Sequence, residues 1–129
     1  MTKRRQTLRM RIPPYFHPRN EWRCSIHKEL AAKAKALGVV YKPKDKLELI
    51  VTLYLDGTAL QFHDIDNRLK DIMDAMQGRA GGPKSSRLLT PIIRNDRQVF
   101  KVTIEKKIPP GQSHGMGHLV VKKYREVTK

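Results

Sequence analysis

LELIVTLYL, residues 47–55, is the stretch around which the rest of the chain can be arranged. Leucine or valine occupies every second position from Leu47 to Leu55, which is the period of a β-strand with a buried face. The other face also carries apolar side chains, at Ile50 and Tyr54. A strand that is apolar on both faces is typical of the interior of a sheet. We therefore expect a central strand here.

The same period of two recurs on both sides of this strand. It predicts one strand within residues 6–13, where Leu8, Met10 and Ile12 alternate with arginines, and two later strands at 99–108 and 118–127. Apolar spacings of three and four predict amphipathic helices at 21–37 and at about 66–77, each followed by a glycine. Residues 78–87, GRAGGPKSSR, predict a mobile loop. The order strand, helix, strand, helix, strand, strand predicts a single α+β domain over 1–129 with a mixed sheet.

Net charge is the strongest feature of the composition. The chain has 27 lysines and arginines against 12 acidic residues, a formal charge of +15. Residues 1–28 carry eight cations and one acid, 29–89 ten and eight, and 90–129 nine and three. A field of this size attracts polyanions through Coulomb attraction and counterion release, so nucleic acid is the expected partner. Basic ends around a nearly balanced centre indicate a binding surface around an acidic spot.

Several classes of protein do not fit the composition. No apolar run approaches the length of about 20 residues that a membrane span needs, and the basic N-terminal stretch lacks the apolar segment of a secretory signal. The cations do not gather on one long amphipathic helix, which argues against a membrane surface. The single cysteine, Cys24, excludes an intrachain disulfide and a multi-cysteine zinc site. We therefore expect a cytoplasmic protein with no membrane partner.

The acidic spot lies in QFHDIDNRLKDIMDAMQG, residues 61–78. Asp64 and Asp66 stand two residues apart where extended chain meets a predicted helix, and in extended chain both carboxylates would point the same way. Asp66 could instead cap the helix. Lys70 follows Asp66 by one helical turn, so its ammonium can reach the same place or form an ordinary surface ion pair. Asp96 comes just before a predicted strand.

Together these residues form a joint pattern, DxDNxxK followed by DA and then by NDxQV. In this chain the matching positions are Asp64, Asp66, Asn67 and Lys70, then Asp74 and Ala75, and finally Asp96, Gln98 and Val99. The pattern and the order of elements resemble those of the RusA-type Holliday-junction resolvase family. The likeness is close over residues 61–78 and 93–102 and loose over most of the remaining chain.

The resemblance implies a small magnesium-dependent endodeoxyribonuclease that acts as a homodimer on branched DNA. Such an enzyme resolves four-way junctions by hydrolysing phosphodiester bonds. Metal binding would fall to Asp64, Asp66 and Asp96, and Lys70 would match the catalytic lysine. Mn²⁺ could substitute for Mg²⁺. Lys70 could stabilise the pentacovalent phosphate or orient the attacking water, as a positioned point charge.

Two features depart from the family pattern. The family usually has two acids before xQV, and Asn95 replaces the first, so this position could supply a neutral ligand or none. The segment between Asp74 and Asp96 is longer than in compact members, which leaves the basic loop 78–90 without a direct counterpart. We expect nucleic-acid contacts from residues in and next to the acidic helix and from this loop: Asn67, Arg68, Arg79, Lys84 and Arg87.

The residue chemistry supports a metal site independently of the family. Phosphodiester hydrolysis needs an activated water and relief of charge on the phosphate; Mg²⁺ supplies both and prefers hard oxygen ligands. Without a cation, three carboxylates would repel one another beside a polyanion. One rival hypothesis is a non-catalytic basic DNA-binding protein on the same fold, which the intact acidic residues and Lys70 argue against. Another is a basic RNA-binding or ribosome-associated protein, for which no stacking-aromatic motif is visible.

Overall fold

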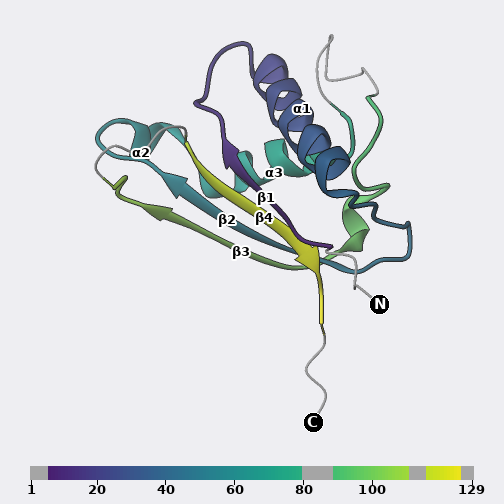
Figure 1. Cartoon of the computed structure of the whole chain (residues 1–129). Helices are drawn as coiled ribbons and strands as arrows, with labels where there is room; N and C mark the ends of the chain where they lie inside the picture. The colour runs from purple at the N-terminus through teal and green to yellow at the C-terminus, as the bar shows by residue number, and fades with distance from the viewer. Residues whose placement is uncertain (1–5, 80–88, 111–115, 126–129) are drawn as a thin grey trace.

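Four strands form one mixed sheet in the computed structural model, which describes residues 6–79, 89–110 and 116–125 (Figure 1). β2 pairs in parallel with β3 and antiparallel with β4, and β4 pairs antiparallel with β1, in the spatial order β1-β4-β2-β3. The α+β class and the interior position of the 47–55 segment are thereby confirmed. The strands are β1 (Leu8–Ile12), β2 (Leu47–Tyr54), β3 (Val99–Lys107) and β4 (Gly117–Lys123).

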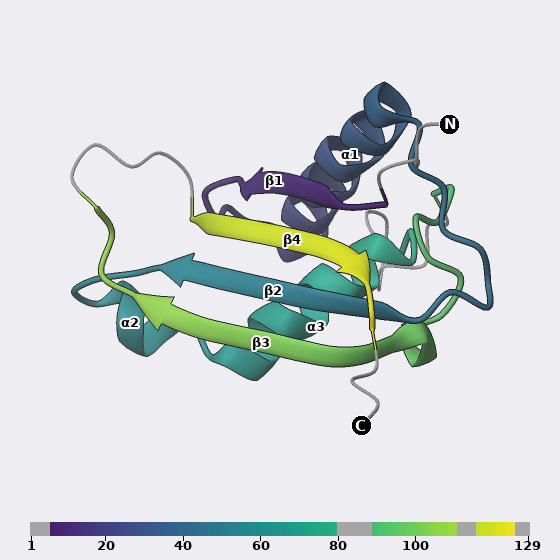
Figure 2. The same cartoon turned by 60° about the horizontal axis from the view of Figure 1, so that its bottom comes forward.

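Two long helices, α1 (Arg19–Leu37) and α3 (Ile65–Met76), cover one face of the sheet. Figure 2 shows the strands in front and both helices behind them, with α1 near β1 and α3 behind β2 and β3. This placement follows from the alternation in the strands, because every second side chain of β2 is fully buried and those between are half-buried. None of the helices in the described ranges combines the length and the apolar character needed to cross a bilayer.

The core lies between the sheet and the two helices. Burial of each large aliphatic or aromatic side chain contributes roughly 1.5–3 kcal/mol, so this layer supplies most of the favourable free energy of folding. The largest completely buried apolar side chains come from α1, α3, β1, β2 and β4 and from the segment before β3: Trp22, Leu8, Ile12, Ile26, Leu30, Leu47, Leu49, Leu53, Ile72, Met76, Ile93 and Leu119.

The structure adds two short elements that the sequence patterns do not predict, α2 (Ala59–Phe62) and a 3₁₀ turn at Asp96–Gln98. α1 begins at Arg19 rather than at residue 21, and β4 ends at Lys123, short of the predicted end. β3 and β4 follow one another in the chain, yet β2 lies between them in the sheet. Most of the predicted mobile loop lies outside the described residues.

Candidate active-site groove

A surface groove of about 420 Å³ brings together most of the predicted catalytic residues. It follows the exposed face of α3 and reaches the turn before β3. Asp66, Lys70 and Asp96 open onto it, so side chains from distant parts of the chain share one space. The residues that line it are Asp66, Leu69, Lys70, Met73, Asp74, Gln77, Arg79 and Asp96.

The spacing of residues on α3 explains one wall of this groove. Positions 66, 70, 74 and 77 recur at intervals of three and four, so their side chains lie in a row on one face of the helix. The opposite face is buried against α1 and the sheet, through Arg68, Asp71, Ile72, Ala75 and Met76. Packing of that buried face fixes which way the groove residues point.

Backbone contacts at the end of α3 bring Asp96 to the groove. The Ile92 amide donates to the Met76 carbonyl at 2.8 Å, and the Leu89 amide donates to the Gly78 carbonyl at 2.9 Å. Gly78 has a φ of +80°, and a Cβ there would lie 2.3 Å from the Leu89 carbonyl oxygen, so this crossing needs glycine. The chain therefore returns along the end of the helix before it reaches Asp96.

Asn95 and Gln98 build the turn that carries Asp96. Asn95 Oδ1 accepts a hydrogen bond from the Arg97 amide at 2.8 Å, and Gln98 Oε1 accepts one from the Asn95 amide at 3.3 Å. These reciprocal bonds form a capping box around the 3₁₀ turn. The Gln98 amide also donates to the Lys42 carbonyl at 2.8 Å. Asn95 is thus a capping residue, while the Asp96 side chain remains exposed.

Asp64 lies beside the groove and does not line it. It is the extended N-cap residue of α3, and its Oδ2 accepts a hydrogen bond from Asn67 Nδ2 at 3.3 Å. Because the helix begins at Ile65, Asp66 is already helical, and its Oδ1 accepts from the Asn67 amide at 3.0 Å. The extended arrangement considered for the two aspartates is therefore not present, and the alternative that Asp66 caps the helix is wrong.

The three-carboxylate cage expected from the sequence is not assembled in this structure. Within residues 6–79, 89–110 and 116–125, no three histidine, cysteine or acidic side chains are arranged to hold a metal ion. The donor chemistry of the groove nevertheless fits Mg²⁺, because Asp66 and Asp96 are exposed carboxylates that line the same space. Mg²⁺ is commonly held by one or two carboxylates and keeps several waters.

A buried charge network behind the groove was not anticipated from the sequence. Asp71 is completely buried, with Oδ1 2.7 Å from Arg23 Nε and 3.0 Å from Arg19 Nε, and Oδ2 3.2 Å from Arg68 Nε. Arg23 Nη1 also lies 3.2 Å from Asp74 Oδ2, so the network links α1 to the wall of the groove. The spacing of Arg68 and Asp71 was a local signal for one pair, whereas nothing local pointed to Arg23.

Arg68 is occupied inside the protein and is not available for the nucleic-acid contact that we predicted. Its guanidinium lies over the rings of Tyr15 and Trp22, at 4.8 and 5.6 Å from their centroids. Its Nη1 lies 3.2 Å from His63 Nδ1. Since arginine can only donate, His63 accepts through Nδ1 and is neutral. Burial, followed by the positive charges of Arg68 and Lys106, lowers the pKa of His63 below its ordinary value.

The other predicted site residues differ in where they lie. Lys70 is exposed in the groove and forms no ion pair with any described residue, and Asp74, one turn further along α3, pairs with Arg23. Arg79 is exposed and lines the groove. Two further predicted contacts in the basic loop, Lys84 and Arg87, lie outside the described residues.

Comparison with protein-family models found no match, and comparison with curated proteins found none either. The groove residues include the exposed carboxylates of Asp66 and Asp96 and the ammonium of Lys70, which pairs with no acid in the described ranges, on a chain of net charge +15.

Proposed function

We propose that this protein is a metal-dependent endodeoxyribonuclease of the RusA type that cuts four-way DNA junctions. The observation that carries the proposal is the shared groove, which Asp66 and Lys70 of α3 line together with Asp96, a residue distant from them in sequence. Exposed carboxylates and an ammonium in one groove suit hydrolysis of a phosphodiester. The charge of +15 suits a DNA substrate, whose phosphate backbone is strongly attracted to a basic protein.

In this proposal Asp66 and Asp96 would hold Mg²⁺, or Mn²⁺ in its place. When bound, the ion supplies a water of lowered pKa and relieves negative charge on the phosphate. Asp64 is proposed as the third carboxylate, which requires its side chain to exchange its hydrogen bond with Asn67 for the ion. Asp74 stays paired with Arg23 and supports the wall of the groove.

Lys70 acts as a positioned charge. Its ammonium forms no ion pair with any described residue, so it can meet a phosphate oxygen in the groove. As the water oxygen bonds to phosphorus and the ester bond to the leaving oxygen breaks, negative charge grows on the phosphate oxygens. A fixed positive charge at that place stabilises the transition state more than the ground state.

Cleavage of a synthetic four-way junction and of a matched duplex, with and without Mg²⁺, tests the proposal. The wild type should cut the junction only with metal. Asp66→Asn and Asp96→Asn should abolish cutting while junction binding survives or tightens, because each removes a negative charge near DNA. Lys70→Ala should slow cutting by a factor of about 10² or more.

Asp56→Asn is the matched control, because Asp56 is exposed and lies outside the groove. It should cut at the wild-type rate. Tight binding of the junction with no cutting in either Mg²⁺ or Mn²⁺ would refute the nuclease and favour the non-catalytic DNA-binding protein. Full activity of either aspartate variant would remove that residue from the metal site.

Resolution of a junction also leads us to propose a homodimer. A four-way junction has approximate two-fold symmetry and needs two cuts, which two symmetry-related grooves can supply. Light scattering should give about twice the chain mass of 14.9 kDa at micromolar concentration. On a plasmid-borne cruciform, both strands should be cut within one binding event. A monomer that releases nicked intermediates would contradict the dimer and indicate a simpler nicking nuclease.

A further inference from the structure

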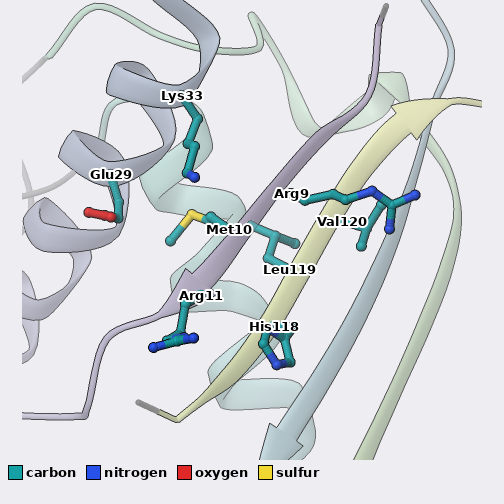
Figure 3. Close-up of a pocket in the computed structure, with 8 residues that line it drawn as sticks. All are labelled: Arg9, Met10, Arg11, Glu29, Lys33, His118, Leu119 and Val120. Carbon is teal, nitrogen blue, oxygen red and sulfur yellow. The ribbon is translucent and has the colours of Figure 1, made fainter. Parts of the chain in front are cut away.

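A second hollow, of about 520 Å³, lies at the β1 edge of the sheet (Figure 3). We call it the β1 groove. Three elements form it, and it shares no lining residue with the candidate active-site groove. Its lining residues are Arg9, Met10 and Arg11 from β1, Glu29 and Lys33 from α1, and His118, Leu119 and Val120 from β4.

The β1 groove is rich in unpaired positive charge. Arg9, Arg11 and Lys33 are exposed, and none of them forms an ion pair within the part of the chain that the structure describes. Glu29 is the one acid among the residues that line the groove. Three cations that line one groove with a single acid make its potential positive, which favours an anionic ligand.

Strand geometry fixes how these side chains are presented. Arg9 and Arg11 alternate with the buried residues of β1, so they project from the sheet face opposite the helices. The register sets Arg11 opposite His118 and Arg9 opposite Val120, which brings side chains of two strands together on that face. Lys33 extends from α1 toward β1 on the other side of the edge, as Figure 3 shows. The groove therefore wraps around the edge strand.

We propose that the β1 groove binds the sugar–phosphate backbone of DNA, as a contact surface separate from the active-site groove. The identity of the nucleic acid rests on the proposed function. Guanidinium groups match phosphate oxygens through paired hydrogen bonds, and a lysine adds a point charge. Among the described strands β1 pairs on one side only, so backbone groups on its other side can contact the same nucleic-acid strand. A second copy of the chain fits poorly, because it would bring a like-charged surface against these cations.

Such a contact holds one arm of a branched substrate and carries no base sequence information. The contact should therefore account for a defined part of the salt dependence of DNA binding. Removal of each phosphate contact should reduce the slope of log K against log salt by about 0.9.

The experiment compares two triple variants by fluorescence anisotropy with a labelled four-way junction and a matched duplex. Binding is measured in EDTA across a range of salt concentrations. The test variant is Arg9→Gln/Arg11→Gln/Lys33→Gln. The control is Lys28→Gln/Lys35→Gln/Lys44→Gln, which removes the same charge from exposed positions that do not line the groove. The test variant should lose up to about 2.7 from the slope and weaken binding at least about tenfold, and the control should lose clearly less.

Three results would overturn the inference. A wild-type slope in the test variant would show that the groove does not contact DNA, and an equal loss in the control would assign the effect to net charge alone. A change in mass by light scattering would make this face an interface between copies of the chain. If the triple variant fails to fold, the single Arg11→Gln should still lose about 0.9 from the slope.

The outcome is independent of catalysis, because binding is measured without metal. If the protein cuts no DNA but its salt slope depends on the β1 groove residues, the proposed nuclease activity is wrong and the β1 groove proposal stands. If the wild type cuts junctions but the test variant keeps the wild-type salt slope, the β1 groove proposal is wrong and the proposed nuclease activity stands.

Discussion

Replacement of Asp71 by asparagine tests whether the buried charge network holds α1 and α3 together. Asp71 is completely buried, and its oxygens lie 2.7 Å from Arg23 Nε and 3.2 Å from Arg68 Nε. The side chains of these arginines are only 5% and 6% exposed. Asparagine has nearly the same shape, so the change removes the charge with little effect on packing. The network should then contain uncompensated positive charge.

The structure sets the expected size of the effect. Removing one partner of a buried ion pair costs about 3–5 kcal/mol, because the opposite charge is left without compensation. Arg23 keeps its contact with Asp74, and Arg19 is 44% exposed and can be hydrated, so the loss falls mainly on Arg68. We therefore expect the lower end, about 3 kcal/mol, out of the roughly 5–15 kcal/mol that stabilises a domain.

Urea unfolding followed by Trp22 fluorescence and by circular dichroism measures this loss. Trp22 is the single tryptophan and is completely buried, so its emission reports the α1 core. Glu105→Gln is the control, because its 3.6 Å pair with Lys107 is more than half exposed and should contribute less than about 0.5 kcal/mol.

A loss below about 1 kcal/mol for Asp71→Asn, with an unchanged dependence on urea, would refute the reasoning. The double variant Asp71→Asn/Arg68→Met separates charge from packing. If uncompensated charge is the cause, the double variant should be more stable than Asp71→Asn alone. A double variant of equal or lower stability would show that packing or hydrogen bonding carries the effect.

Three further changes test other parts of the site. Gly78→Ala should destabilise by more than Gly57→Ala in urea unfolding, since both have positive φ but only at Gly78 would the new Cβ meet backbone, and equal losses would contradict this. The pKa of His63 is lowered from 6.5 in the folded protein, so the unfolded chain binds a proton at His63 more strongly. Thermal stability should therefore fall as the pH drops below about 6.5. His63→Asn should flatten this pH dependence. Gln98→Leu should cost about 2–3 kcal/mol, because it leaves two amides before the turn and two carbonyls before β2 without their side-chain partner. A loss under about 0.5 kcal/mol in urea unfolding would show that water replaces them.

Local patterns in the sequence were sufficient to identify the main elements. The alternation of 47–55 predicted an interior strand, and the structure has β2 at Leu47–Tyr54 between two others. The helical spacing before Gly78 predicted α3 to within a residue at each end. These features are local. The period of the apolar residues follows from which face of a single element is buried, and the glycine marks where that element ends. The separation of Asp66 and Lys70 by one turn was predictable for the same reason.

Contacts between distant segments were decided only by the tertiary structure. No local pattern could place β4 between β1 and β2, since strand partners are chosen by how several apolar faces pack together. The same packing brought Asp96 to α3 and left Asp64 outside the groove lining. It also placed Asp71 among arginines from another helix. Whether a charged side chain meets solvent or a buried partner depends on elements far along the chain, and for this reason Arg68 could not be assigned from its neighbours in sequence.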